Sequence, residues 1–130
     1  MVILQKRSQR KATGGRYVKL KVRRKAQKGS LPTFTKLDSK RKLKRVRVRG
    51  GNTKFRLYTD YEINLFDKEN KKCQKGKILK VESCPANRNY VRRNILVKGT
   101  TVNTDKGKAV ITNRPGQEGT INGVLVAESA

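Results

Sequence analysis

Residues 45–66, RVRVRGGNTKFRLYTDYEINLF, decide the fold that we expect of this chain. Basic and apolar residues alternate through the first five positions, which is typical of a strand with one basic face. Gly50, Gly51 and Asn52 follow and are typical of a tight turn. The alternation then resumes and continues to Leu65. The stretch therefore predicts a β-hairpin that leads into a further strand.

Short apolar stretches continue along the rest of the chain, separated by polar, Gly-rich or Pro-rich breaks. The first is a strand at residues 77–82, for which alternation predicts that Leu79 and Val81 point inward. Further strands are expected over residues 90–97, 100–104, 108–112 and 120–126. We therefore expect an all-β fold, a small closed or partly open β-barrel of about six to seven short strands with a long basic N-terminal extension. Residues 31–45 are the one region where a short helical turn is compatible with the pattern.

The charge of the chain is concentrated in its N-terminal part. The 130 residues include 34 Lys and Arg against 9 Asp and Glu, a net charge of +25. Residues 1–56 contain 21 basic residues and one acidic residue, so +20 lies there and +5 lies on residues 57–130. We expect two parts, a basic N-terminal extension over residues 1–43 and a β-barrel domain over residues 44–130. A compact body of this charge repels itself, which predicts a polyanionic partner, either nucleic acid or an acidic membrane surface.

Composition also excludes several kinds of site. The chain has no His and only two Cys, so it cannot build a Ser-His-Asp or Cys-His catalytic pair or a four-ligand zinc site of Cys and His. No apolar stretch approaches the ~20 residues of a membrane span, and the first residues lack the order of a secretory signal. Cys73 and Cys84 are expected to be free thiols in a reducing, intracellular compartment. We expect no enzymatic activity, no metal, no cofactor and no membrane insertion.

Residues 5–29 form the longest basic segment, with eleven Lys and Arg and few large apolar residues. Such a segment buries too little surface to offset its ordering entropy, so we expect it to be extended alone and to fold along a phosphate backbone when bound. A solvated tail without specific use and a nuclear-localisation patch are the alternatives. The candidate RNA-binding residues of this segment are Lys6, Arg7, Arg10, Lys11, Gly14, Gly15, Arg16, Lys19, Lys21, Arg23, Arg24 and Lys25.

The expected hairpin carries the sharpest local cluster of charge. Alternate positions are expected to project five cations from one face, namely Arg45, Arg47, Arg49, Lys54 and Arg56. Cross-strand neighbours on one face lie about 5 Å apart, so the cluster repels itself unless phosphates sit between the charges. Arg binds phosphate oxygens bidentately, and glycines at the turn let backbone N–H groups approach an anion. We predict a phosphate-binding hairpin in which Asn52 also takes part. The alternative is a solvated outer face.

A second cluster lies at residues 87–94. Asn and Arg bond base edges or sugar hydroxyls, and Tyr90 is either a stacking platform for an unpaired base or a core residue. Residues 112–117 form a weaker candidate, with a tight Pro-Gly hairpin turn as the alternative. The candidate RNA-binding residues of these two segments are Arg88, Asn89, Arg92, Arg93 and Arg114. Only 5% of the residues are aromatic, which favours folded, duplex-rich RNA over single strands that stack on aromatic rings.

Distinctive short motifs are distributed along the chain. They are Arg10-Lys11-Ala12-Thr13-Gly14-Gly15, Pro32-Thr33-Phe34-Thr35, Arg45-Val46-Arg47-Val48-Arg49-Gly50-Gly51-Asn52 with Lys54 and Arg56, Pro85-Ala86-Asn87 with Asn89-Tyr90-Val91-Arg92-Arg93-Asn94-Ile95, Lys98-Gly99, and Thr112-Asn113-Arg114-Pro115-Gly116-Gln117-Glu118-Gly119. In this order and at this spacing they resemble the ribosomal protein S8e family of the archaeal and eukaryotic small ribosomal subunit. The match runs over nearly the whole chain, and its compact length resembles the archaeal type. Residues 26–29 lack a Glu-Leu before the Gly, and Asp38 stands where a Gly is common.

The resemblance implies a β-barrel body with a long N-terminal extension buried in small-subunit rRNA, and no enzymatic activity. We expect a structural constituent of the small ribosomal subunit, located in the cytoplasm, that binds and stabilises folded rRNA by phosphate neutralisation and shape recognition. Its expected partners are small-subunit rRNA and neighbouring small-subunit proteins, with the chain a monomer within the ribosome and without a small-molecule substrate. The alternatives are a ribosome-biogenesis factor of the same fold that binds pre-rRNA transiently, and a freestanding nucleic-acid chaperone.

Overall fold

The computed structural model describes residues 8, 10–18 and 28–126. By its internal contacts the chain divides into two compact units, residues 1–32 and residues 33–130. The strands and helices named below belong to the second unit, and the first unit contains a short turn. We predicted a boundary between residues 43 and 44, which separates the basic extension from the barrel domain by their expected roles. This boundary stays a prediction.

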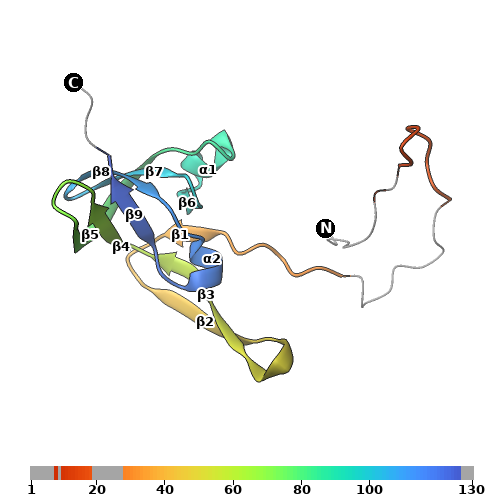
Figure 1. Cartoon of the computed structure of the whole chain (residues 1–130), viewed down its shortest axis with the longest axis horizontal. Coiled ribbons are helices and arrows are strands. Elements are labelled where there is room, and N and C mark those ends of the chain that lie inside the picture. Colours follow the sequence, from red (N-terminus) through yellow and green to blue (C-terminus); the bar gives the residue numbers. More distant parts are fainter. Residues whose placement is uncertain (1–7, 9, 19–27, 127–130) are drawn as a thin grey trace. The chain divides into compact units, whose positions relative to one another are not determined.

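The second unit is built mostly of strands (Figure 1). In chain order these are β1 (Thr35–Leu37), β2 (Lys42–Arg47), β3 (Thr53–Asp60), β4 (Glu62–Asp67), β5 (Lys72–Ser83), β6 (Ile95–Leu96), β7 (Thr101–Thr104), β8 (Gly107–Ile111) and β9 (Asn122–Leu125). Two short helices, α1 (Arg88–Arg92) and α2 (Pro115–Glu118), lie between strands. A 3-10 turn at Arg49–Gly51 joins β2 to β3.

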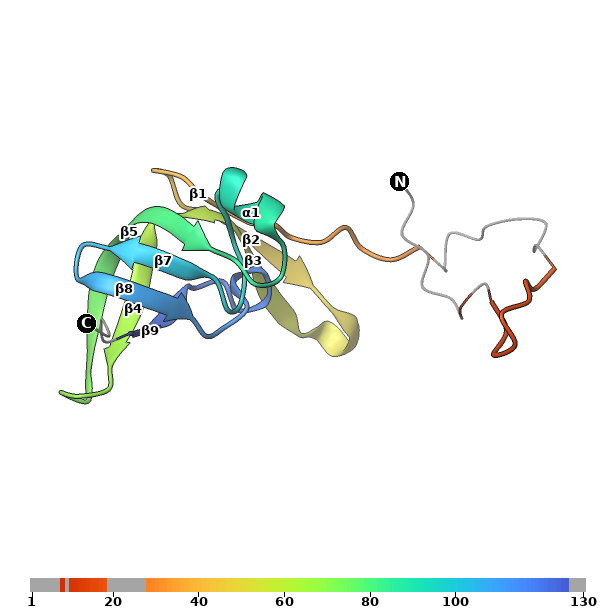
Figure 2. The same ribbon diagram turned by 90° about the horizontal axis from the view of Figure 1, so that it is seen from above.

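Five of the strands close into a barrel in the order β4-β5-β7-β8-β9. Neighbours along this order run antiparallel, and a parallel pairing of β4 with β9 closes the barrel. Figure 2 shows these strands wrapping around a common interior. The expected all-β fold with a small barrel is therefore confirmed, although five strands close the barrel where we predicted six to seven. The interior is filled by Ile63, Leu65, Ile78, Val81, Val102, Ala109, Ile111 and Ile121, each at most 5% exposed.

A second sheet of four strands has the order β2-β3-β1-β6. β2 and β3 form an antiparallel hairpin, β1 runs parallel to β3, and β6 runs antiparallel to β1. Leu57 and Leu96 of this sheet join the core cluster of the barrel, whereas the turn of the hairpin projects beyond it (Figure 1). Residues 31–45 contain β1 and the start of β2 in place of a helical turn.

β5 departs from the expected alternation at one position. Leu79 is 66% exposed, whereas Ile78 and Val81 are buried. The pairing of β5 with β7 shifts register between Ile78 and Lys80, and a β-bulge of this kind places an extra residue in one strand. The prediction that Leu79 points inward was therefore wrong, because the bulge changes which residues of the strand face the core.

Residues 90–97 do not form the single strand that we predicted. The chain enters α1 first, and only Ile95 and Leu96 pair as β6. The side chain of Asn87 caps α1 by accepting a hydrogen bond from the backbone N–H of Asn89 at 2.9 Å. Asn94 follows the helix with a φ of 50°, in the left-handed region that commonly ends helices. The prediction was wrong because these two Asn residues override the strand-like pattern between them.

Residues 112–117 lead into α2 rather than a tight hairpin turn, and the helix ends at Gly119 with a φ of 80°. Asn113 is buried and holds this segment in place. Its Nδ2 donates to the carbonyl of Thr120 at 2.8 Å, and its Oδ1 accepts the backbone N–H of Asn122 at 3.0 Å. These hydrogen bonds of the Asn113 side chain therefore fix the position of α2.

Candidate nucleic-acid interface

The register of the β2–β3 hairpin divides its cations between two faces. Lys44 pairs directly with Arg56. Directly paired residues of an antiparallel hairpin point to the same face, and successive residues of a strand point to opposite faces. Lys54 and Arg56 therefore share a face with Lys44, whereas Arg45 and Arg47 share the other. The prediction of five cations on one face was wrong, because the length of the turn sets this register.

Arg49 lies in the turn of the hairpin and not on a strand. The backbone N–H of Val48 donates to the carbonyl of Asn52 at 2.8 Å and closes the turn. Gly50 and Gly51 have φ angles of 75° and 76°, a conformation that is strained for residues with a side chain. The two glycines thus let the chain reverse within a few residues and leave Arg49 at the tip.

The cations of the hairpin have few partners among the described residues. Those of β2 and of the turn are exposed, and the two ion pairs in the described part of the chain lie elsewhere. The Nζ of Lys54 donates to Oε1 of Gln117 in α2 at 3.1 Å. Arg56 is half-buried, and its Nε has no hydrogen-bond partner among the described residues. Most of this positive charge is therefore free to bind a ligand outside the chain.

Two further cations of the hairpin were missed by the alternating sequence pattern. Lys42 and Lys44 lie on β2 and are exposed. The alternation of basic and apolar residues begins at Arg45, but the basic run that starts at Lys40 is a signal that includes both lysines.

Arg41 differs from the cations of the hairpin, because it forms an ion pair within the described structure. Its Nε lies 3.4 Å from Oδ2 of Asp60, and its Nη2 donates to the carbonyl of Gly119 at 3.2 Å. Asp60 is only 3% exposed and also accepts the backbone N–H groups of Tyr61 and Glu62. Arg41 therefore ties the start of β2 to the end of β3 and to α2.

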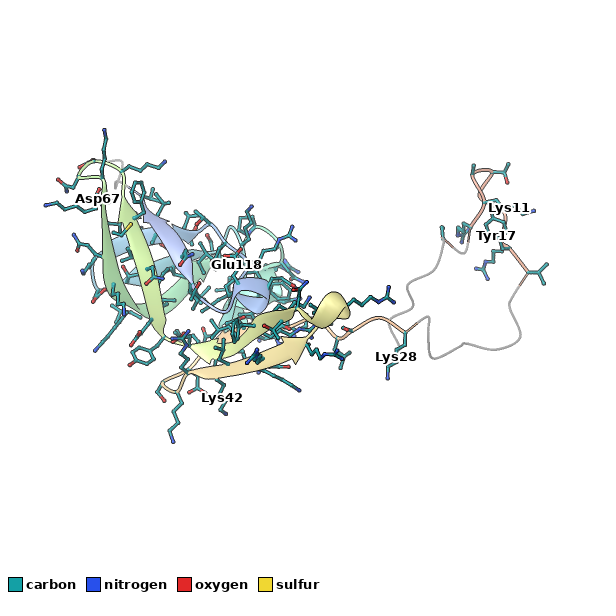
Figure 3. The ribbon with its side chains drawn as sticks, turned by 60° about the horizontal axis from the view of Figure 1, so that its bottom comes forward. Lys11, Tyr17, Lys28, Lys42, Asp67 and Glu118 are labelled. Carbon is teal, nitrogen blue, oxygen red and sulfur yellow. The ribbon has the colours of Figure 1, made fainter. Side chains whose placement is uncertain are left out.

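α2 packs on the base of the hairpin. A Cβ at Gly119 would lie 2.7 Å from Cβ of Phe55 and 3.0 Å from Cδ1 of Leu43, so the end of the helix touches both strands. Figure 3 shows α2 beside the hairpin, with side chains projecting from both strands. Arg114, a predicted RNA ligand, is exposed at the N-cap of α2. The hairpin and α2 thus place predicted ligands on adjoining elements.

α1 presents a second group of cations. The guanidinium of Arg93 lies 5.8 Å from the centroid of the Phe34 ring, and that ring packs against Tyr90 with 5.6 Å between centroids. Tyr90 is half-buried and lies outside the core cluster, so it is not the core residue of our alternative. The other predicted ligands of α1 are exposed, and they are Arg88, Asn89 and Arg92.

The first residues of the second unit connect the two helices. Thr33 lies against Gly116 of α2, where a Cβ would come within 3.0 Å of it. Phe34, the next residue, packs against Tyr90 of α1. α1, α2 and the hairpin therefore lie around β1, the strand that follows Phe34 in the chain.

The described part of the extension forms a turn held by its own backbone. The N–H of Lys11 donates to the carbonyl of Gly15 at 2.7 Å, and the N–H of Gly14 donates to the carbonyl of Lys11 at 3.0 Å. Arg10 pairs with Arg16 across this turn, which brings five of the predicted ligands together. The predicted ligands Lys6, Arg7, Lys19, Lys21, Arg23, Arg24 and Lys25 lie outside the described residues.

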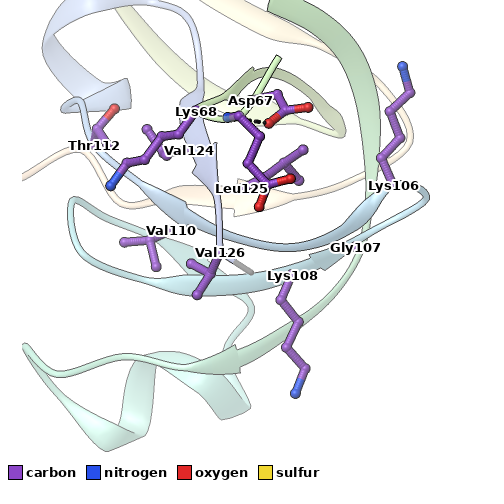
Figure 4. Close-up of a pocket in the computed structure, with 11 residues that line it drawn as sticks. Asp67, Lys68, Lys106, Gly107, Lys108, Val110, Thr112, Val124, Leu125 and Val126 are labelled. Carbon is purple, nitrogen blue, oxygen red and sulfur yellow. Dashed lines mark hydrogen bonds between the residues drawn. The ribbon is translucent and has the colours of Figure 1, made fainter. Parts of the chain in front are cut away.

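A hollow on the barrel has a different character (Figure 4). Val110 and Val124 give it an apolar floor, and its rim carries both acidic and basic side chains. The side-chain amide of Asn70 and the backbone N–H of Glu69 donate to the carboxylate of Asp67 on this rim and lower its pKa. The mixed charge of the rim suits phosphate less well than the hairpin does.

The described residues contain no cluster of three or more His, Cys, Asp or Glu side chains that could hold a metal ion. Both cysteines are free thiols, Cys73 exposed and Cys84 buried. Within the same described ranges, no helix has the length and hydrophobicity required to cross a bilayer.

Comparison with known proteins establishes the family. The sequence profile of the family described as ribosomal protein S8e matches residues 4–126. The chain belongs to the ribosomal protein S8e family. One relative, the small ribosomal subunit protein eS8 of Hyperthermus butylicus, is 48% identical over 118 residues, which are 90% of this chain and 87% of that protein. The eS8 protein of Sulfolobus acidocaldarius is 48% identical over 120 residues, 92% of this chain and 93% of its own.

A third S8e relative, the eS8 protein of Methanobrevibacter smithii, is 47% identical over 126 residues, which cover 97% of this chain and all of that protein. These relatives are archaeal, in agreement with the archaeal type that the compact length of the chain resembles. S8e proteins are structural components of the ribosome and not enzymes, so the expectation that the chain is no enzyme is confirmed by its family.

Proposed function

We propose that the protein is a structural constituent of the small ribosomal subunit, in the cytoplasm, where it binds and stabilises folded rRNA. Its membership of the S8e family supports this function, as do the names of its relatives as small ribosomal subunit proteins. The mechanism is neutralisation of phosphates and recognition of backbone shape, because the candidate ligands are mainly cations and not readers of base edges. The chain acts as a monomer beside neighbouring ribosomal proteins.

The charge of the hairpin is the observation that carries this proposal. Residues 42–56 contain seven Lys and Arg and no Asp or Glu. Six of the nine acidic side chains of the chain bond to other groups in the described structure, and they are Asp38, Asp60, Asp67, Glu82, Asp105 and Glu118. A patch that is exposed and uncompensated within its own fold is best stabilised by an external polyanion.

The proposed contacts with rRNA fall into three groups. The hairpin contributes Lys42, Lys44, Arg45, Arg47, Arg49, Asn52, Lys54 and Arg56. The two helices contribute Arg88, Asn89, Arg92, Arg93 and Arg114. The extension contributes Lys6, Arg7, Arg10, Lys11, Gly14, Gly15, Arg16, Lys19, Lys21, Arg23, Arg24 and Lys25. Each phosphate neutralised is expected to add roughly 0.7–0.9 to the slope of log affinity against log salt.

The extension is proposed to run between rRNA helices. Its eleven basic residues lie within residues 5–29, a length too poor in apolar side chains to form a core of its own. The turn at Lys11–Gly15 gives this segment one locally fixed point at which basic side chains gather. The backbone N–H groups and the cations near this turn are suited to phosphate oxygens.

Retention of the protein in mature small subunits tests this function against its alternatives. A structural constituent is expected to co-sediment with mature small subunits after a high-salt wash, in a ratio close to one copy per subunit. A biogenesis factor is expected only in precursor particles, and a freestanding chaperone is expected to leave in the wash. Either of these results would replace the proposal.

A further inference from the structure

We propose that the β2–β3 hairpin separates two segments of RNA backbone and binds one on each of its faces. The inference rests on the proposed function, because it takes rRNA as the partner. Beyond that function, two RNA segments meet at the hairpin, and a different set of residues binds each of them.

The register supplies the first argument. Arg45 and Arg47 point to one face, and Lys44, Lys54 and Arg56 point to the other. Both faces thus carry at least two cations, and no acidic residue lies between Lys42 and Arg56. A hairpin that binds RNA with one face only has no electrostatic need for cations on its second face.

The pairing of Lys44 with Arg56 supplies the second argument. Their Cβ atoms lie about 4.5–5.5 Å apart in such a pair, and like charges at that distance destabilise a hairpin. A phosphate placed between the two side chains would turn this repulsion into attraction on the face opposite to Arg45.

The thickness of the hairpin supplies the third argument. Successive side chains of a strand point to opposite faces of the sheet, whereas charge-assisted hydrogen bonds to phosphate span only about 2.7–2.9 Å. One backbone segment cannot make direct contacts with both faces at the same level of the hairpin. Gly50 and Gly51 keep the tip free of side chains at two positions, so the hairpin is narrow where it would enter between two segments.

α2 distinguishes the two faces from each other. Gly119 at the end of α2 touches Phe55 and Leu43, which share a face with Arg45. The RNA segment on that face is therefore bounded by α2 at the base of the hairpin. On the other face the contact from α2 is polar, because Oε1 of Gln117 accepts a hydrogen bond from Nζ of Lys54 at 3.1 Å. The two bound segments are expected to differ in position along the hairpin.

Site-directed cross-linking from consecutive residues tests this inference. Lys44→Cys and Arg45→Cys each remove one cation and place a thiol on opposite faces at the same level. The parent carries Cys73→Ser, because Cys73 is exposed, and keeps the buried Cys84. Each full-length variant is coupled to a short azidophenacyl cross-linker and bound to small-subunit rRNA of Sulfolobus acidocaldarius. Lys75→Cys on the barrel strand β5 is the matched control, and its cross-linking yield is expected to be several-fold lower.

The cross-links are expected to map to two rRNA segments that are separate in the secondary structure of the RNA. Cross-links from both positions to one continuous segment, or from only one of the two positions, would overturn the inference and leave the proposed function standing. Failure of both the wild-type protein and the Cys73→Ser parent to bind this rRNA would instead count against the proposed function itself.

A footprint with paired substitutions provides a second readout that does not depend on the cross-linker. Lys44→Gln with Arg56→Gln is expected to remove protection of one RNA segment only. Arg45→Gln with Arg47→Gln is expected to remove protection of the other. Thermal unfolding of each variant shows whether the fold is retained. If either doubly substituted variant is folded but loses both footprints equally, the assignment of one RNA segment to each face is wrong.

Discussion

Lys44 and Arg56 lie directly opposite each other across the β2–β3 hairpin, so two cations occupy one cross-strand pair. A pair of this kind opposes folding, since like charges directly opposite each other are unfavourable by roughly 0.2–1 kcal/mol. The described acidic side chains that form ion pairs do so at other places and do not relieve it. The protein keeps an unfavourable pair at the position where we propose that phosphate binds.

Replacing Lys44 with Glu is therefore expected to stabilise the protein and to weaken rRNA binding. An opposite-charge pair with Arg56 replaces a repulsive one, which should raise the free energy of unfolding by about 0.2–1 kcal/mol. Urea denaturation and rRNA titration at fixed salt measure the two effects. Lys75→Glu, whose partner across β4 and β5 is Asn64, is the control and should change both quantities less. A Lys44→Glu protein that binds rRNA as well as the wild type would contradict the role of the hairpin.

The contact between α2 and the hairpin is tested by alanine at two glycines. Gly119 and Gly99 have φ angles of 80° and 83°, so alanine is similarly strained at both. A Cβ at Gly119 meets Phe55 at 2.7 Å, whereas nothing lies within 4 Å of a Cβ at Gly99. Backbone strain alone is expected to lower the free energy of unfolding by about 1–2 kcal/mol at each site. Overpacking is expected to lower it by about a further 1–3 kcal/mol at Gly119 only. Equal destabilisation in urea would show that α2 is not packed tightly on the hairpin.

The Arg41 and Asp60 pair is expected to matter more for folding than an exposed ion pair does. Asp60 is 3% exposed, and Arg41→Gln leaves its carboxylate without a cation. The free energy of unfolding should therefore fall by about 1–3 kcal/mol. Lys108→Gln removes the partner of Glu82 in an exposed pair and should cost less than about 1 kcal/mol. Thermal unfolding of both variants measures the difference. A larger loss for Lys108→Gln would refute the structural role of Arg41.

Deletion of residues 1–30 separates the extension from the folded unit. That segment contains eleven basic residues, so the salt dependence of rRNA binding should fall by several units of log–log slope. The second unit begins at residue 33 and has its own core, so the truncated chain should retain a cooperative unfolding transition. The slope is measured by titration at several salt concentrations. If the slope is unchanged, the extension does not neutralise phosphates.

The loop between β4 and β5 has a pH dependence that follows from Asp67. The amide of Asn70 and the N–H of Glu69 stabilise its carboxylate, so its pKa in the folded protein is below its value in the unfolded chain. The sign follows from linkage: this stabilisation is present above the unfolded pKa and is lost as the pH falls through the folded pKa. NMR titration should show a lowered pKa that rises in Asn70→Ala. An unchanged pKa in that variant would rule out the Asn70 amide as the main cause of the shift.

The parts of the fold that depend on local periodicity were predictable from the sequence. The alternation around Ile63 and Leu65 indicated strand β4 and its buried face, and both side chains are 1% exposed. The bulge between Ile78 and Lys80 was not predictable in this way. An extra residue in one strand changes which side chains face the core, but it leaves no mark in the residue types of the strand. The exposure of Leu79 is the result.

The candidate site shows the same division between local and non-local information. The sequence indicated which residues of the hairpin are basic, but the pairing of Lys44 with Arg56 depends on how the turn closes between Val48 and Asn52. A shift of one residue in that turn would exchange the faces of one strand. Helix α1 was missed for a related reason, because the cap formed by Asn87 outweighs the β propensity of the residues after it.

A density map of a small ribosomal subunit that contains this chain tests the central claim most directly. The hairpin of residues 42–56 and the extension are expected to lie within hydrogen-bonding distance of rRNA phosphates, with RNA on both faces of the hairpin. The barrel hollow around Val110 and Val124 is expected not to contact phosphates. A map in which the hairpin cations face solvent or another protein, with no phosphate near them, would contradict the account.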